Sequence, residues 1–127
     1  MKNLRTPLSE VKGLGSAKEG TSHFWSQRLS AIALTPLVLW LCFSVAALPG
    51  MDYLSVREWL ASPLTSIMMV LLVAVAFFHS RLGLQVIVED YVGGHGARTV
   101  AIIAITFAAG VLAVVGVFSV LRIAFAG

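Results

Sequence analysis

Long apolar stretches without a single charge alternate with shorter polar stretches along this chain. No charged residue occurs in the windows 29–51, 59–80 and 99–121. Each window is about 22 residues long, and about 20 apolar residues in a helix cross the hydrocarbon core of a bilayer. The windows are continuous, which favours helices over the short alternating segments of a transmembrane β-barrel. The pattern therefore predicts an all-α integral membrane protein with three transmembrane helices.

Helix-breaking residues set the expected limits of these helices, at about 26–48, 63–92 and 97–125. The pair Pro49-Gly50 ends the first helix, and Pro36 inside it predicts a kink or a lost hydrogen bond. Pro63 suits the first turn of the second helix, with Ser62 as its cap. In the third helix, Gly110 and Gly116 are small enough to permit close contact with another helix.

The composition supports a membrane location and narrows the function. Apolar residues make up 58% of the 127 residues and charged residues only 12%, whereas soluble domains contain about 25% charged residues. A single cysteine, Cys42, excludes an intrachain disulfide and a cysteine-based zinc site within one chain. The net charge of +3 indicates membrane orientation, and no nucleic-acid partner is expected.

The polar residues 1–25 are interpreted as a cytoplasmic arm that precedes a membrane-anchor domain over 26–127. The polar lead is too long for the start of a cleaved signal peptide. Cationic residues are concentrated in this N-terminal region, at Lys2, Arg5, Lys12, Lys18 and Arg28. Because Lys and Arg favour cytoplasmic segments, the N-terminus and the second loop should be cytoplasmic, and the C-terminus should lie on the other side.

His79 lies near the middle of the second expected helix, at membrane depth. An ionisable side chain there is costly and usually functional. Three interpretations remain open at this point: a neutral histidine bonded to a Ser or Thr of a neighbouring helix, a metal or haem ligand, or a step in a proton path. Gly83, one turn later, leaves room for a flat macrocycle or serves as a notch for helix packing.

Polar residues toward the membrane surface extend the candidate site. Asp90 follows His79 by eleven residues, which places both on one helix face to within about 20°. Tyr91 beside it is either an interfacial anchor or a functional hydroxyl. Arg28 is either a snorkelling side chain or an anion-binding group. Arg81 points away from His79, and we expect it to snorkel or to pair with a carboxylate.

Only one histidine, His79, is deep in the membrane, since His23 and His95 lie outside the windows. A haem held by two histidines would therefore need its second ligand from another chain. A three-helix protein of this size also leaves its polar face unshielded. Both points predict an obligate partner subunit.

Two segments carry a family resemblance. His79, Gly83 and the pair Asp90-Tyr91 resemble, in spacing, a motif of the small hydrophobic membrane-anchor subunit (SdhD) of succinate dehydrogenase, respiratory complex II. The stretch 20–28, GTSHFWSQR, is similar to the N-terminal signature of the alphaproteobacterial-type branch. The resemblance covers nearly the whole chain.

The resemblance implies a role in the bacterial inner membrane, as a non-catalytic anchor in the tricarboxylic acid cycle and respiratory chain. The chain would pair with a second, SdhC-like anchor subunit in a heterodimeric bundle that holds the flavoprotein and iron–sulfur subunits. His79 would be an axial ligand of the iron of haem b, which the two anchors share. Tyr91 would bind ubiquinone with support from Asp90, and Arg28 would lie near the haem propionates and the quinone pocket.

Two other function classes compete with an electron-transfer anchor. A small transporter or channel subunit would use His79 as a proton relay, whereas a structural assembly factor would tolerate replacement of both His79 and Tyr91. A red complex with b-type absorbance favours the electron-transfer anchor.

Overall fold

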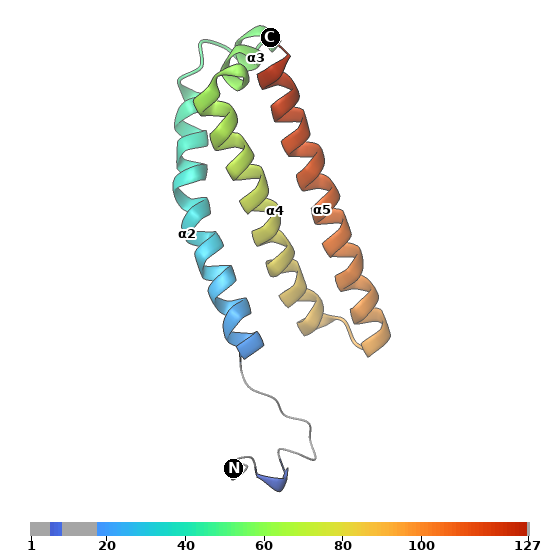
Figure 1. The fold of residues 1–127 in the computed structure, drawn as a ribbon. Coiled ribbons are helices and arrows are strands. Elements are labelled where there is room, and N and C mark those ends of the chain that lie inside the picture. Colours follow the sequence, from blue (N-terminus) through green and yellow to red (C-terminus); the bar gives the residue numbers. More distant parts are fainter. Residues whose placement is uncertain (1–5, 9–17, 127) are drawn as a thin grey trace.

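A computed structural model describes residues 6–8 and 18–126, with the side chains of 18 and 19 excepted. Within these residues the chain is helical and contains no strand, so the predicted all-α class is confirmed. Three helices are long and apolar enough to cross a membrane. The elements, shown in Figure 1, are α2 (Lys18–Ala46), α3 (Tyr53–Ala61), α4 (Pro63–Tyr91) and α5 (His95–Phe125).

Helix α2 begins earlier than the sequence predicted. It starts at Lys18 rather than near residue 26, and it ends at Ala46, shortly before Pro49. No proline lies between Lys18 and the apolar window, so the helix extends out of that window without losing a backbone donor. Pro36 lies inside the helix, which remains continuous across it. Of the predicted cytoplasmic arm, residues 1–5 and 9–17 lie outside the described residues, and its cytoplasmic location stays a prediction.

Helix α3 was not predicted. Asp52 caps its N-terminus, because the carboxylate accepts hydrogen bonds from the backbone N–H of Ser55 (3.2 Å) and from its Oγ (2.7 Å). These bonds hold the pKa of Asp52 below its ordinary value. Near the C-terminal end of the short helix, the Trp59 ring stacks on Trp40 of α2 with 6.0 Å between ring centroids.

The limits of α4 and α5 agree closely with the prediction. Pro63 occupies the first turn of α4, and Ser62 is the cap residue, although its side chain makes no capping bond. Helix α4 ends at Tyr91, and α5 begins at His95 after a two-glycine turn. Gly94 has φ of 84°, a left-handed conformation that glycine adopts at little cost.

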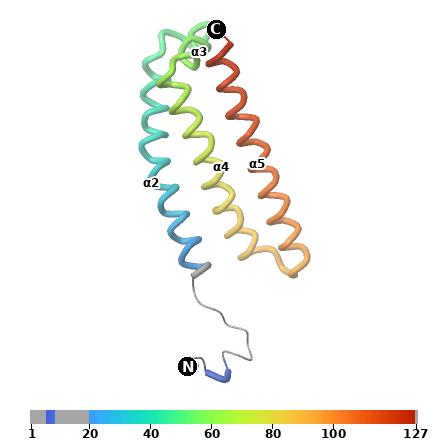
Figure 2. Tube along the Cα trace, viewed as in Figure 1, coloured from blue at the N-terminus to red at the C-terminus, as the bar shows by residue number. Residues whose placement is uncertain are grey.

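The three long helices lie side by side with α4 in the middle, as the tube in Figure 2 shows. Helix α4 contacts both α2 and α5, while α2 and α5 do not contact each other within the described residues. Few side chains are therefore buried inside the chain, and many large apolar side chains remain exposed. Such a layer must be covered by lipid or by partner helices.

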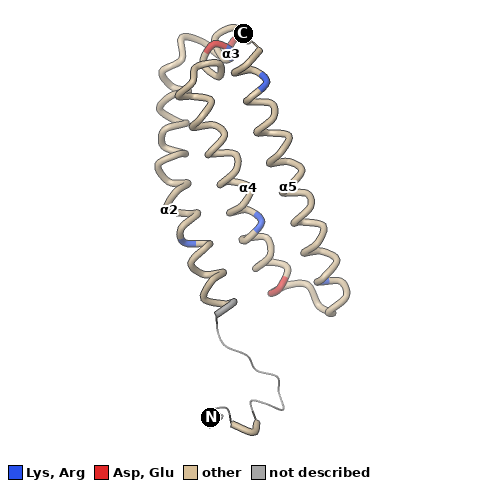
Figure 3. Tube along the Cα trace, in the orientation of Figure 1, with Lys and Arg blue, Asp and Glu red and all other residues tan. Residues whose placement is uncertain are grey.

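The two ends of the layer are formed by different elements. The start of α2 and the α4–α5 turn lie at one end, and α3 and the C-terminus lie at the other (Figure 1). Acidic residues occur at both ends, and basic positions on α2 and α4 lie between them (Figure 3). Three crossings with this geometry place the α4–α5 turn on the same side of the membrane as the start of α2.

Candidate functional site

His79 lies at the interface of α2 and α4. Its Nδ1 atom is 2.8 Å from the Oγ of Ser30, a side chain of α2 that is only 6% exposed. The bond to a Ser or Thr of a neighbouring helix, which one of the three interpretations of His79 required, is thus present, and it does not exclude ligation through the other ring nitrogen. Within the described part of the chain, the other ring nitrogen, Nε2, has no hydrogen-bond partner. The ring is therefore held at one nitrogen and open at the other.

A cavity of about 460 Å³ lies between α2 and α4, one turn along α4 from His79, and neither His79 nor Ser30 lines it. Gly83 lines it from α4, and an added Cβ there would meet only Gln27 Nε2, at 3.8 Å. Gly83 therefore does not serve as a tight notch between helices of this chain. It leaves open space on the helix turn that follows His79.

Two polar atoms beside this cavity are buried without a hydrogen-bond partner. They are Nε2 of His23 and Oε1 of Gln27, both on α2. Most buried polar atoms in proteins are paired with protein, water or a ligand. These orphaned atoms indicate that a polar group from outside the chain completes this region.

A second cavity, of about 520 Å³, lies beside the first and shares His23 with it. Its polar lining consists of hydroxyl, imidazole, guanidinium and amide groups, and no carboxylate lines it. The residues are Ser22, His23, Ser26, Phe78, Arg81, Leu82 and Gln85. The cationic and donor groups favour an anionic or carbonyl-bearing occupant.

The fold does not place the Arg28 side chain at the interface that contains His79. Its guanidinium carbon lies 5.4 Å from the centroid of the Phe24 ring, and the residue is exposed and lines neither cavity. Arg28 precedes Ser30 by two residues, which is about 200° around the helix. Because Ser30 faces α4, Arg28 faces away from α4. Its predicted role toward a propionate or quinone therefore depends on a group that lies outside this interface.

Asp90 and Tyr91 are the last two residues of α4, and both are exposed. The helix is unbroken from His79 to Asp90, so the helical spacing behind their predicted shared face is present. Tyr91 is 83% exposed, and its hydroxyl has no partner among the described residues. The phenol is thus available to a molecule outside the chain.

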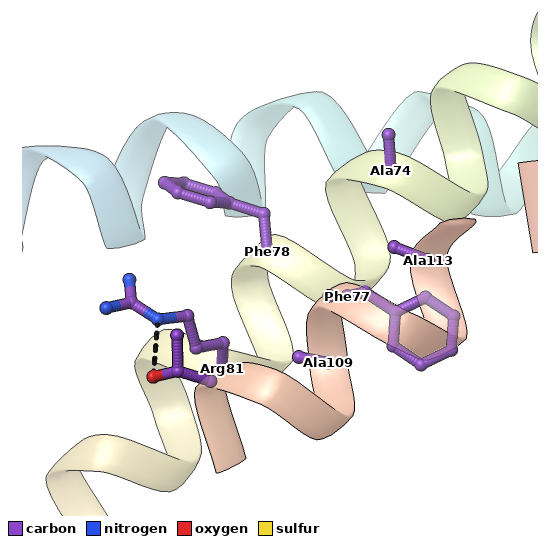
Figure 4. Close-up of a pocket in the computed structure, with 8 residues that line it drawn as sticks. Ala74, Phe77, Phe78, Arg81, Ala109 and Ala113 are labelled. Carbon is purple, nitrogen blue, oxygen red and sulfur yellow. Dashed lines mark hydrogen bonds between the residues drawn. The ribbon is translucent and has the colours of Figure 1, made fainter. Parts of the chain in front are cut away.

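Arg81 makes a contact that the sequence did not predict. Its Nε donates a hydrogen bond to Thr106 Oγ1 of α5, at 3.3 Å, as the dashed line in Figure 4 shows. A carboxylate partner, one of the two alternatives expected for Arg81, is not found among the described residues. The bond lies at a cavity of about 300 Å³ between α4 and α5, whose lining is otherwise apolar. A small hydroxyl residue within an apolar window was the only signal for Thr106.

Other participating residues were also missed by sequence reasoning. Ser30 lies at the start of the first apolar window and belongs to no distinctive motif, and Gln27 lies just before the window, within the stretch 20–28, where no role was assigned to it. Their part in the site depends on which face of α2 meets α4. The described residues contain no group of three or more side chains suited to hold a metal ion.

Comparisons with known proteins agree on one family. Residues 2–117 match the family described as "Succinate dehydrogenase/Fumarate reductase transmembrane subunit". The chain is 33% identical over 103 residues to the succinate dehydrogenase hydrophobic membrane anchor subunit of Rickettsia bellii, covering 81% of this chain and 82% of the relative. It is 36% identical over 98 residues to that of Paracoccus denitrificans, covering 77% and 75%. The succinate dehydrogenase membrane anchor subunit of Reclinomonas americana is 35% identical over 88 residues, covering 67% and 73%.

Proposed function

The chain belongs to the family of succinate dehydrogenase/fumarate reductase transmembrane subunits, and from this premise we propose a specific role for it. It is a membrane anchor of succinate:ubiquinone oxidoreductase that helps to bind haem b and ubiquinone. With a second anchor subunit it attaches the flavoprotein and iron–sulfur subunits to the membrane. The exposed apolar faces of the helix layer support this assignment, because they need a partner bundle and lipid to cover them.

The haem assignment depends on the hydrogen bonding of the two ring nitrogens of His79. One ring nitrogen is bonded to Ser30, and the other is unpaired, as is usual for a histidine that ligates a metal. Gly83 leaves space on the following turn, and the orphaned polar atoms of His23 and Gln27 lie beside that space. When bound, haem supplies a one-electron carrier. His79 of this chain would supply one imidazole ligand, and the second anchor subunit would supply the other.

The quinone assignment depends on Tyr91. A quinone oxygen gains negative charge as it is reduced, and a phenol hydroxyl can donate a hydrogen bond to it. The exposed Tyr91 hydroxyl at the end of α4 is free to do so. Asp90 beside it supports the site, and Arg28 contributes positive charge from the outer face of α2.

A spectrum of the purified complex tests the haem proposal. We expect the complex that carries the tagged parent chain to show a reduced-minus-oxidised b-type spectrum. His79→Ala removes the imidazole, so the haem is lost or its low-spin spectrum changes. His95→Ala is the matched control, since His95 is exposed at the start of α5. A colourless parent complex would instead favour the proton-relay alternative, and an unchanged low-spin spectrum in His79→Ala would falsify the ligand assignment.

Turnover with two electron acceptors tests the quinone proposal. Tyr91→Phe keeps the ring and removes the hydroxyl, so electron transfer from succinate to a soluble dye should be retained. Quinone reduction should fall by about tenfold or more, because a tenfold change in rate corresponds to about 1.4 kcal/mol of transition-state stabilisation. Tyr53→Phe is the control, since Tyr53 is an exposed tyrosine on α3 at the opposite end of the layer. Equal quinone-to-dye ratios in Tyr91→Phe and parent would reduce Tyr91 to an interfacial anchor.

We further propose that the chain lies in the bacterial inner membrane with its N-terminus in the cytoplasm and its C-terminus in the periplasm. Cysteine labelling of intact cells tests this orientation in a Cys42→Ser background. The exposed positions 95 and 53 lie at opposite ends of the layer. A periplasmic, membrane-impermeant reagent should label Tyr53→Cys and not His95→Cys. The reverse pattern would show that the orientation is inverted.

A further inference from the structure

The Ser30 hydroxyl makes two short contacts at once. Its Oγ lies 2.9 Å from the backbone carbonyl oxygen of Gln27, one turn earlier on α2, and 2.8 Å from Nδ1 of His79 on α4. Ser30 is one of the few polar residues of the described chain that are buried. The hydroxyl therefore connects the backbone of one helix to the imidazole of another.

The number of available protons determines which group donates in each of these two hydrogen bonds. A carbonyl oxygen only accepts hydrogen bonds, and a serine hydroxyl has a single proton to donate. Ser30 must give that proton to the Gln27 carbonyl, since otherwise two acceptor oxygens would face each other at 2.9 Å. The hydroxyl then accepts a bond at its contact with His79, and Nδ1 must be the nitrogen that carries the proton. A neutral imidazole has only one N–H, so Nε2 retains its lone pair.

From this geometry we propose that Ser30 is a positioning residue, which fixes His79 in the tautomer that has its proton on Nδ1. The inference rests on the proposed function, in which Nε2 of His79 ligates haem iron. An acceptor on the outer N–H of a ligating histidine sets the ring orientation and makes the ligand more basic. The Gln27 carbonyl orients the Ser30 hydroxyl, and the hydroxyl orients the ring.

Substitutions at Ser30 distinguish the effect of its hydroxyl group from the effect of the space that its side chain fills. Ser30→Ala removes the acceptor, while Ser30→Thr keeps a hydroxyl able to bond the preceding helical turn. Thr35→Ala is the matched control, because Thr35 bonds the carbonyl of Ala31 in the same helix and contacts no histidine. Ser30→Cys keeps the size of the side chain and offers only a weak sulfur acceptor.

The experiment measures haem content, the low-spin electron paramagnetic resonance spectrum and the haem midpoint potential in the purified complex. In Ser30→Ala we expect haem affinity to fall by about tenfold or more, as when other groups that hydrogen-bond a metal-ligating histidine are lost. A less basic imidazole stabilises ferric iron less, so the midpoint potential should rise. If ferric affinity falls tenfold further than ferrous affinity, the rise is about 59 mV for one electron. Ser30→Thr should return the potential toward the parent value, and Thr35→Ala should equal the parent.

The comparison of His79→Ala with Ser30→Ala distinguishes failure of this inference from failure of the proposed function. If His79→Ala keeps the parent spectrum, the ligand assignment itself is wrong. If His79→Ala loses the haem signal while Ser30→Ala keeps the parent haem content, spectrum and potential, the function stands and the role of Ser30 is overturned. Should Ser30→Ala not assemble, Ser30→Cys decides: a raised potential supports the inference, and a parent potential overturns it.

Discussion

The two interfaces of helix α4 are built differently, although the same helix supplies one side of each. Toward α5 the contact is close and mainly apolar, and Gly116 lies directly against Val73. Toward α2 it contains the buried hydroxyl of Ser30, the His79 imidazole and cavities with orphaned polar atoms. Close packing of small residues drives helix association in membranes, whereas polar groups at membrane depth are usually retained for function. We therefore expect the α4–α5 interface to stabilise the chain and the α2–α4 interface to hold the proposed haem ligand.

Gly116 and Gly83 illustrate this difference between the two interfaces of α4. An added Cβ on Gly116 would lie 2.8 Å from Val73 Cγ1, which is a collision. On Gly83 the nearest atom would be Gln27 Nε2 at 3.8 Å, which is ordinary contact. The same residue type therefore permits close packing at one interface and leaves an open space at the other.

The largest effect is expected at the α4–α5 interface, from Gly116→Leu. A branched side chain placed against Val73 should destabilise the complex by about 1–3 kcal/mol, the usual cost of overpacking. The measurement is the fraction of complex that remains intact after heating in mild detergent. Gly110→Leu is the control on the same helix, since an added Cβ there meets no atom within 4 Å. Equal losses in both variants would contradict the close contact, and Val73→Ala should partly rescue Gly116→Leu.

At the α2–α4 interface, Gly83→Leu should give the opposite pattern. Its side chain fills the cavity beside His79, so haem affinity should fall by about tenfold or more, equivalent to 1.4 kcal/mol. The thermal stability of the haem-free complex should stay close to that of the parent. Haem per complex and melting are measured on one preparation, with Gly83→Ala as the smaller substitution. A Gly83→Leu complex with full haem content would show that the cavity is not the haem site.

Thr106→Val sharpens the comparison, because it alters the polar bond within the otherwise apolar α4–α5 interface. Valine keeps the shape of threonine and removes the acceptor of the Arg81 bond. Hydrogen bonds between transmembrane helices contribute about 0.6 kcal/mol on average, so we expect a small loss of thermal stability. Thr99→Val is the control, since Thr99 bonds only the His95 carbonyl of its own helix. A loss as large as that of Gly116→Leu would mean that this bond, rather than close packing, holds the interface.

The smallest effect is expected at α3, which contacts α4 and α5 at the end of their interface. Asp52→Ala removes the N-cap and should speed hydrogen exchange of the first amides of α3 only, whereas Asp52→Asn should restore protection. The pKa of Asp52 is lowered in the folded chain, so the cap is fully present above the unfolded pKa. It is lost as pH falls through the lowered folded pKa. Exchange that is unchanged in Asp52→Ala would show that contacts with α4 and α5 suffice to hold α3.

Several features of the fold were predictable because each depends on local sequence. Charge-free windows of membrane length fixed the number of spanning helices, and Pro63 and the two glycines after Tyr91 fixed both ends of α4. The early start of α2 and the existence of α3 were missed. Both segments mix polar and apolar residues, so no uninterrupted hydrophobic pattern marks them.

The candidate site was predictable only in part. His79 stood out because an ionisable residue at membrane depth is rare, and Tyr91 because it ends the same helix. Ser30 and Thr106 did not stand out, since hydroxyl residues are common in apolar helices. The Thr106 partner of Arg81 was not predicted, because the sequence of α4 does not reveal which helix packs beside it.

The sequence by itself determined that this chain is a three-span membrane protein with one histidine at membrane depth. Those properties follow from hydropathy and helical length, which depend on neighbours along the chain. Only the tertiary structure decided that Ser30 faces His79 and that Arg81 binds Thr106. It also decided that Gly83 borders a cavity, whereas Gly116 packs closely against Val73. These pairings depend on the rotation and axial offset of each helix against the next. Both are set by side-chain packing summed over whole interfaces, which no local pattern in the sequence specifies.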